Sequence, residues 1–210
     1  KFGERLAAKH ADEVIVLSSN MKEYFREIYG RETAFIPNGI ALPERKEAKE
    51  IREKWKLSKD EYILFLARIV PEKGIHYLIQ AYQKLSTDKK LVIAGGSSHS
   101  KEYFCQLKEM AAGDDNIIFT DFVGGRTLEE LYSNAYLFVL PSDVEGMAIG
   151  LLEAMSYGNC CLVSDIPENT EVVEDNAVTF KHGDAEDLQR QMELLLLNPD
   201  KVWEYRKTAA

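Results

Sequence analysis

The sequence has few cysteines and lacks any long apolar run. None of its hydrophobic stretches approaches the ~20 residues that a helix needs to cross a bilayer, and its first residues do not have the pattern expected of a signal peptide. The three cysteines, Cys105, Cys160 and Cys161, match no zinc-binding spacing. We therefore expect reduced, buried cysteines and a cytoplasmic protein, with peripheral association at the inner face of the membrane left open.

Positive charge is also in short supply. Lysine and arginine number 26 against 35 acidic residues, a formal net charge of −9 over 210 residues. Such a balance excludes nucleic acid or an anionic membrane as the main partner, although it permits a local basic pocket. The hydrophobic content of 45% is ordinary for a globular protein and sufficient for a core.

Short apolar segments alternate with amphipathic ones through most of the chain. We predict strands at residues 62–67, 91–94, 117–120, 136–140, 160–163 and 178–180. Helices are predicted at residues 75–85, 101–112, 147–157 and 185–197, with a short helix to residue 134 that begins at a Thr127–Glu130 capping box. Near-continuous apolar strands between helices indicate an α/β fold with a doubly wound parallel sheet.

The first forty residues differ from this pattern. Short strands at residues 14–17 and 34–36 enclose a helix that we expect to begin at an Asn20–Glu23 capping box and to stop at Gly30. Residues 37–43 read as a turn and a boundary, and residues 44–56 as a solvated, charged helix. We expect residues 1–42 to be the remnant of one domain and its linker, residues 43–210 to form a second domain, and the chain to be a piece of a longer protein.

The rest of the chain is organised around residues 141–158, PSDVEGMAIGLLEAMSYG. The predicted helix in this stretch is apolar all round and therefore expected to be buried, yet Glu145 precedes it and Glu153 lies within it. Helix N-termini bind phosphate through free N–H groups, and carboxylates accept hydrogen bonds from sugar hydroxyls. The combination predicts a site for a nucleotide sugar. Pairing of each glutamate with an arginine is the structural alternative.

Three further loops follow predicted strands. Arg68 and Lys73 are two cations in one loop that can bind a diphosphate, unless they pair with Glu72. Residues 94–99 contain a glycine pair, a weak ligand signal, and His99 reads as a loop or capping residue. Residues 122–126, which include Val123, form a candidate wall for a base. An Asp-x-Asp type of metal site is not favoured at residues 143–145, because cations already surround the expected phosphate position.

The order and spacing of these motifs resemble the retaining GT-B glycosyltransferases with an E-x(7)-E motif, over residues 62–197. Residues 11–16 and 36–40 resemble the end of that family's first domain. The resemblance implies that Arg68 and Lys73 bind the donor diphosphate, that Glu153 binds the ribose and that Glu145 contacts the transferred sugar. The implied catalytic residues are Arg68, Lys73 and Glu145. The implied donor-binding residues are Arg68, Lys73, Val123, Glu145, Gly146, Met147, Ala148, Ile149 and Glu153.

The resemblance also implies an activity: hexosyl transfer with retention from a nucleotide-diphosphate sugar, with UDP-sugar expected, and with neither metal nor cofactor. The acceptor, a glycan, a lipid-linked saccharide or a small molecule, would be bound by a missing N-terminal domain, so we expect the chain alone to be inactive. Departures from the family pattern are Ala67, the Gly146-Met147-Ala148 triplet in place of Gly-Phe-Gly, and the absence of the family's usual active-site histidine. A nucleotide-sugar epimerase and a non-catalytic nucleotide-binding module remain as alternatives.

Overall fold

The computed structural model describes residues 2–96 and 100–209, so His99 lies outside the described residues. Within those ranges the main body contains a six-stranded parallel sheet in the order β5-β4-β3-β6-β7-β8. The strands are β3 (Tyr62–Leu66), β4 (Lys90–Ala94), β5 (Ile117–Asp121), β6 (Leu137–Leu140), β7 (Cys161–Ser164) and β8 (Val178–Phe180). The chain builds outward from β3 in one direction and from β6 in the other, so the strand order reverses between them. The predicted doubly wound α/β fold is confirmed.

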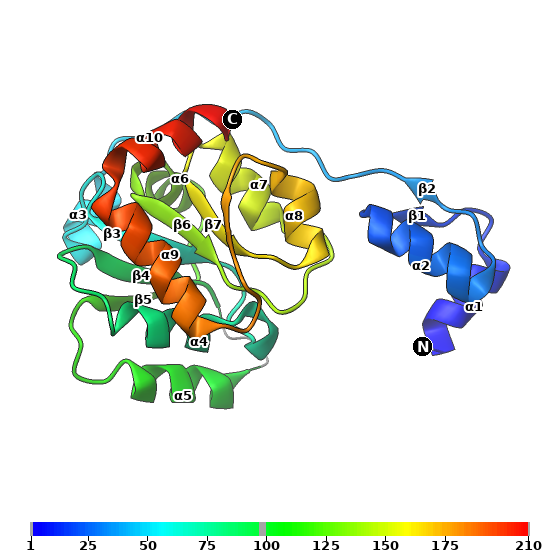
Figure 1. Cartoon of the computed structure of the whole chain (residues 1–210), viewed down its shortest axis with the longest axis horizontal. Coiled ribbons are helices and arrows are strands. Elements are labelled where there is room, and N and C mark those ends of the chain that lie inside the picture. Colours follow the sequence, from blue (N-terminus) through cyan, green and yellow to red (C-terminus); the bar gives the residue numbers. More distant parts are fainter. Residues whose placement is uncertain (1, 97–99, 210) are drawn as a thin grey trace.

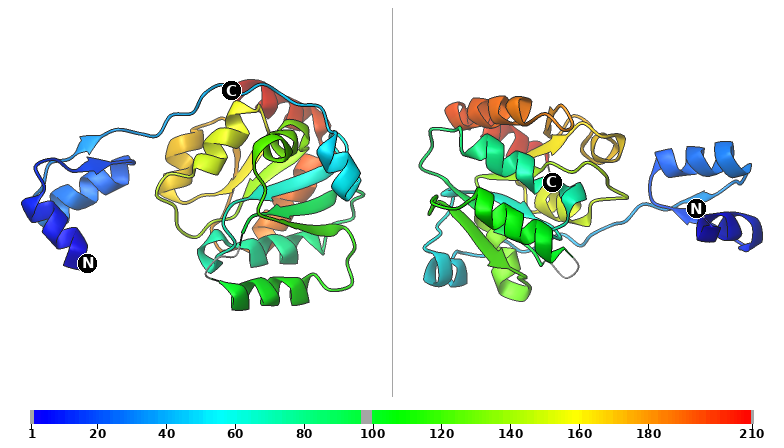
Figure 2. Two further views of the ribbon diagram at one scale, coloured as in Figure 1. Left: turned by 180° about the vertical axis from the view of Figure 1, so that it is seen from behind. Right: turned by 90° about the horizontal axis from the view of Figure 1, so that it is seen from below.

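Helices cover both faces of the sheet. On one face α4 (Ile75–Tyr82) adjoins both α5 (Lys101–Met110) and α9 (Ala185–Leu197), which lies in front in Figure 1. On the other face α3 (Glu50–Trp55) adjoins α6 (Gly125–Asn134), and both come forward with α7 (Ile149–Ser156) in the rear view of Figure 2. The remaining helical elements are the 3₁₀ turn η1 (Pro71–Lys73), α8 (Pro167–Val173) and α10 (Pro199–Thr208).

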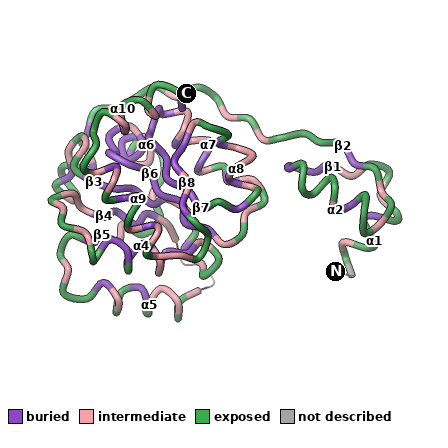
Figure 3. Tube along the Cα trace, in the orientation of Figure 1, coloured by how far each residue is buried: buried purple, intermediate pink, exposed green. Residues whose placement is uncertain are grey.

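Burial from both sides explains why the strands read as continuous apolar runs. Ile63, Leu64 and Phe65 are consecutive in β3, and all three are fully buried. Every residue of β6 and β7 is buried as well, and the central strands are purple in Figure 3. Alternating side chains of one strand therefore pack against helices on opposite faces, as a parallel sheet requires.

A smaller N-terminal unit, residues 2–35, stands beside the main body (Figure 1). It contains α1 (Phe2–His10), β1 (Ile15–Val16), α2 (Ser19–Tyr29) and β2 (Ala34–Phe35), and the two short strands pair in parallel. Its own apolar cluster is formed by Ala8, Val16 and Phe25. Residues 36–49, which we call the linker, contain neither helix nor strand.

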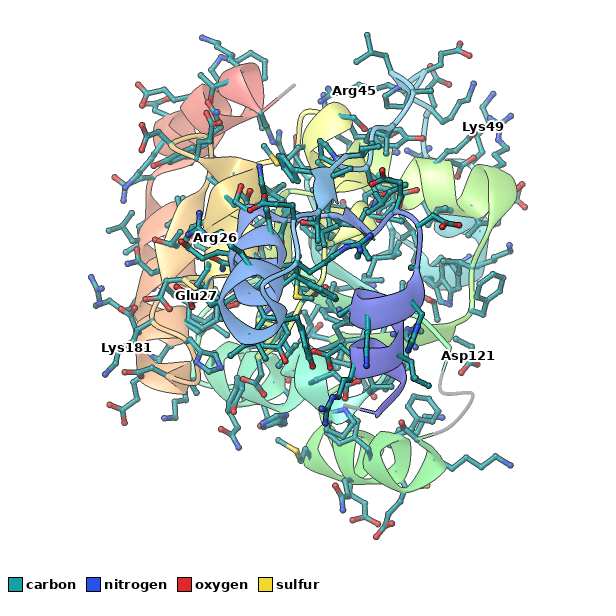
Figure 4. The ribbon with its side chains drawn as sticks, turned by 90° about the vertical axis from the view of Figure 1, so that its right-hand side faces the viewer. Arg26, Glu27, Arg45, Lys49, Asp121 and Lys181 are labelled. Atoms are coloured by element: carbon teal, nitrogen blue, oxygen red, sulfur yellow. The ribbon has the colours of Figure 1, made fainter. Side chains whose placement is uncertain are left out.

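The N-terminal unit and the start of the linker each contact the main body. The backbone N–H of Ser19, at the start of α2, donates to both carboxylate oxygens of Glu171 on α8, at 3.0 and 3.1 Å. In the linker, the N–H of Asn38 lies 3.1 Å from the sulfur of Met147. In the side view of Figure 4, the N-terminal unit lies in front of the main body. The first contact caps a helix whose donors would otherwise be unpaired.

Several local predictions about helix starts are wrong. The α2 cap is Ser18, whose hydroxyl accepts from Met21 N–H, rather than Asn20. Residues 44–56 are helical only in α3, and Ile51 there is fully buried. Helix α6 begins at Gly125, so Thr127 and Glu130 lie inside it instead of forming a capping box.

The buried Glu130 carboxylate serves another helix. It accepts hydrogen bonds from the N–H groups of Lys49 and Ile51, at 2.8 and 3.2 Å. It also forms an ion pair with Arg126, at 2.8 Å. Glu130 therefore caps α3, 79 residues away from Ile51 in sequence. Lys49 and Arg45, labelled in Figure 4, both belong to the linker, and Arg45 donates to the backbone oxygens of Tyr157 and Gly158. The charged stretch is thus attached to the body.

The cysteine prediction is partly correct. Cys160 and Cys161 are free and buried, whereas Cys105 is free but exposed on α5, because its position falls on the outer face of that helix. Among the described residues, no helix combines the length and the apolar character that crossing a bilayer needs.

Candidate active site

A cleft of about 830 Å³ opens at the carboxyl ends of β3 and β6, where the strand order reverses and where α/β sheets bind ligands. Its walls come from the end of β3 and η1 (Leu66, Ala67, Arg68, Glu72, Lys73), from residues 140 and 144–151 with Glu153, and from Leu17 and Asn38 on the N-terminal side. Eight of the nine predicted site residues line it. The exception is Val123, which packs partly buried against the core.

The loop after β3 is held against the loop after β6 by a glycine. Gly74 has φ +64°, and a Cβ there would lie 2.0 Å from the carbonyl oxygen of Pro141. Next to it, Asp143 N–H donates to the backbone oxygen of Glu72 at 2.8 Å. Only a residue without a side chain permits this approach, and the approach brings Lys73 to the residues that precede α7.

Lys73 forms an ion pair with Glu145, with Nζ 2.5 Å from Oε1. The side chains are 13% and 5% exposed, so the pair is largely removed from water. Ser142 Oγ donates to the same carboxylate oxygen at 2.7 Å. The alternative in which Lys73 pairs with Glu72 is therefore wrong. Arg68 is exposed and makes no side-chain ion pair or hydrogen bond with any described residue, so its guanidinium is available at the cleft.

The N-terminus of α7 closes one end of the cleft. Helix α7 begins at Ile149, two residues later than predicted, and its N-cap residue Ala148 provides no side-chain cap. Ala148 has φ −76°, so the alanine that replaces a family glycine is not strained. Ile149 is 51% exposed, which corrects the expectation of a helix buried all round. Because the cleft lies on that side and no side chain caps the helix, the first N–H groups of α7 face the cleft without a side-chain partner.

Glu153 is one turn further along α7 and also lines the cleft. Its Oε2 accepts a hydrogen bond from the phenol of Tyr132 at 3.0 Å. No arginine or lysine pairs with it among the described residues, so the structural alternative for this glutamate is wrong. Sequence reasoning missed Tyr132 because nothing distinguishes it from the other buried aromatic residues of a helix.

The residues around Glu145 point in different directions. Asp143 Oδ1 lies 2.8 Å from Nε2 of His182, a residue of the loop after β8. Glu145 instead faces Lys73. The two carboxylates therefore do not converge. Within the described ranges, no group of three or more His, Cys, Asp or Glu side chains is arranged to hold a metal ion.

The family profile of glycosyl transferases group 1 matches residues 47–210. The chain belongs to this family. An uncharacterized glycosyltransferase of Methanocaldococcus jannaschii is 33% identical over 81% of the chain and 47% of its own length. The O-antigen chain mannosyltransferase B of Escherichia coli is 30% identical over 72% of the chain and 40% of its own length. The chain thus spans less than half the length of these two relatives.

Solved structures share the fold of this chain. HepE of Anabaena, in complex with UDP and glucose, superposes with a TM-score of 0.89 at 19% identity, over 99% of the chain and 60% of that protein. Sucrose-phosphate synthase of Thermosynechococcus elongatus gives a TM-score of 0.83 at 24% identity, over 99% and 55%. The resemblance drawn from the sequence is confirmed for family and fold. Family membership does not favour the epimerase or the non-catalytic module.

Proposed function

We propose that this glycosyltransferase chain is the donor-binding part of an enzyme that transfers a hexosyl group from UDP-sugar to an acceptor, with retention and without a metal ion. One observation carries the proposal: two cations, an uncapped helix N-terminus and two glutamates surround a single cleft at the switch point. Cations and N–H groups suit a diphosphate, and carboxylates suit hydroxyls.

Each residue has a role in this proposal. Departure of the nucleoside diphosphate builds negative charge on its oxygens, and Arg68, Lys73 and the α7 N–H groups stabilise that charge. Glu145 accepts hydrogen bonds from the transferred sugar, and the backbone of Gly146, Met147, Ala148 and Ile149 lies beside sugar and phosphate. Glu153 accepts hydrogen bonds from the ribose. No metal is required in this proposal because Arg68 and Lys73 lie around the expected position of the diphosphate. Val123, outside the cleft, keeps only a proposed role near the base.

The remaining elements of the proposal concern the whole protein. Residues 1–42 are proposed to be the remnant of an acceptor-side domain, because Leu17 and Asn38 reach the cleft from that side. The missing part would bind the acceptor, a glycan, a lipid-linked saccharide or a small molecule. Relatives named as mannosyltransferases support a hexose as the transferred group. Free cysteines fit a reducing, cytoplasmic location, with peripheral membrane association as an open alternative.

Calorimetric titration of the chain with UDP, GDP and ADP tests the donor site and identifies the base. We expect one nucleotide to bind, with unchanged affinity in EDTA and at least tenfold weaker affinity in Glu153→Ala, a loss typical of a hydrogen bond to a charged group, about 1.5–3 kcal/mol. The proposal would be contradicted if binding needs a divalent cation, or if Glu153→Ala leaves the nucleotide affinity unchanged.

Transfer itself is tested with the full-length protein and with the chain alone. We expect the full-length enzyme to give a product with the anomeric configuration of the donor, measured by NMR. The chain alone should transfer little or no sugar. An inverted product would refute retention, and robust acceptor-dependent transfer by the chain would refute the need for the missing domain.

A further inference from the structure

A buried phenol supports Glu153 from behind. Tyr132 lies on α6 and is only 1% exposed, yet its hydroxyl reaches α7, where it lies 3.0 Å from Glu153 Oε2 and 3.2 Å from the backbone oxygen of Gly150. A phenol has one proton to donate, and the charged carboxylate is the stronger acceptor of the two. Oε1 of Glu153 has no hydrogen-bond partner among the described residues.

The position of this phenol is fixed by packing. The Tyr132 ring stacks on Tyr157, with centroids 5.3 Å apart and an interplanar angle of 14°, and it also contacts Phe138 at 6.0 Å. The backbone is fixed too, since Asn159 Nδ2 donates to the carbonyl oxygens of Tyr132 and Ala154, both at 3.0 Å. The hydroxyl therefore has little freedom to move relative to α7.

A glycine makes room for the contact. A Cβ on Gly150 would lie 3.4 Å from the Tyr132 hydroxyl and 3.1 Å from the carbonyl oxygen of Leu66. The first turn of α7 thus sits tightly between the end of β3 and the phenol, and Glu153 follows one turn later on the same side. Tyr132, Gly150 and the end of β3 together fix the place of the Glu153 carboxylate.

We infer that Tyr132 is a positioning residue: it holds Oε2 of Glu153 so that Oε1 is free to accept a hydrogen bond from a ribose hydroxyl. The inference rests on the proposed function of the cleft. Burial, together with the nearby Glu153 carboxylate, raises the pKa of Tyr132 well above its ordinary value of 10. The phenol therefore stays protonated, and remains a donor, throughout the pH range in which the enzyme would work.

The test compares ribose recognition rather than overall affinity. Wild-type chain is titrated with UDP, 2′-deoxy-UDP and 3′-deoxy-UDP, or with the corresponding forms of whichever diphosphate binds. We expect one deoxy form to bind about tenfold more weakly than the ribose form. Tyr132→Phe, which keeps the ring, should reduce that ratio to about twofold, and Glu153→Ala should abolish it. A variant that only loosened the fold would reduce the affinity for all three nucleotides by the same factor.

Tyr157→Phe is the matched control. It removes the hydroxyl of the stacked neighbour. That hydroxyl makes no hydrogen bond to Glu153, and the backbone bond from Tyr157 N–H to the Glu153 carbonyl oxygen is kept, so the ribose preference should stay about tenfold. A tenfold preference that persists in Tyr132→Phe but disappears in Glu153→Ala would overturn the inference and leave the donor site intact. A wild-type chain without ribose preference, or without nucleotide binding, would overturn the donor site itself.

A second measurement does not depend on the variant. In a crystal of the wild-type chain with the diphosphate, the inference requires Tyr132 on Oε2 and a ribose hydroxyl on Oε1 of Glu153. A structure in which Glu153 binds the ribose but no longer contacts the Tyr132 hydroxyl would overturn the inference.

Discussion

Lys73 and Glu145 are 72 positions apart in sequence, yet Nζ of the lysine lies 2.5 Å from Oε1 of the glutamate. The pair joins the loop after β3 to the loop after β6 across the switch point of the sheet. It also means that the cation proposed to bind a diphosphate is already partnered. A diphosphate must therefore compete with Glu145 for the ammonium group.

Glu145→Gln is expected to bind UDP several-fold more tightly than wild type, because it removes the competing charge. Lys73→Met should bind UDP at least about tenfold more weakly, through loss of a charge-assisted contact. Calorimetry with UDP measures both. Glu72→Gln is the control, since it makes the same change in charge beside the cleft without touching Lys73. Equal gains from the two glutamine variants would show that only net charge matters.

Gly74→Ala is expected to destabilise the protein by about 3–5 kcal/mol, because a Cβ would meet the Pro141 oxygen and a positive φ adds its own cost. Gly125→Ala is a matched control: its φ is +55°, and nothing lies within 4 Å of its Cβ position. It should cost only about 1–2 kcal/mol. Urea unfolding compares the two variants. Similar losses would show that the close approach of the two loops carries no energetic weight.

Glu130 is expected to make stability depend on acid pH. Burial alone would raise the pKa of this carboxyl, but the Arg126 guanidinium and the N–H groups of Lys49 and Ile51 outweigh burial and hold it below its ordinary value of 4.5. A lowered folded pKa contributes stability above about pH 4.5, and this contribution is lost as the pH falls through the folded value. Glu130→Gln weakens hydrogen bonds to a charged acceptor and should therefore cost about 1.5–3 kcal/mol at pH 7 and less at pH 3.

The measurement is urea unfolding of both proteins across that range. Glu129→Gln, one position earlier on α6, is the control, because no ion pair or hydrogen bond is formed by its side chain among the described residues. A difference between wild type and Glu130→Gln that stays constant from pH 7 to pH 3 would contradict the prediction.

Glu171→Ala is expected to loosen the N-terminal unit without affecting the main body. The variant removes both acceptors of the Ser19 N–H, and exchange of that amide proton with solvent should accelerate at least tenfold. Exchange in β3 and β6 should not change. Glu168→Ala on the same helix is the control. If Ser19 exchanges at the same rate in both variants, Glu171 does not hold the unit in place.

The sequence alone determined the order of elements and the position of the cleft. Helix α9 runs from Ala185 to Leu197 as predicted, and Gly158 is left-handed at φ +64°, as expected just beyond α7. The carboxyl ends of β3 and β6 carry the cations and glutamates that the motifs indicated. These features depend on periodicity, on helix-stopping residues and on strand direction, all of which act within a few neighbours along the chain.

Only the tertiary structure decided which groups meet. Thr127 and Glu130 have the spacing of a capping box, but the Glu130 carboxylate gains more from a helix start 79 residues away and from Arg126 than from its own turn. Likewise Lys73 pairs with Glu145 instead of Glu72, and Tyr132 reaches Glu153. A local sequence pattern indicates which kinds of partner a side chain can bind. Its actual partner is decided by the packing of helices and loops that bring distant polar groups together away from water.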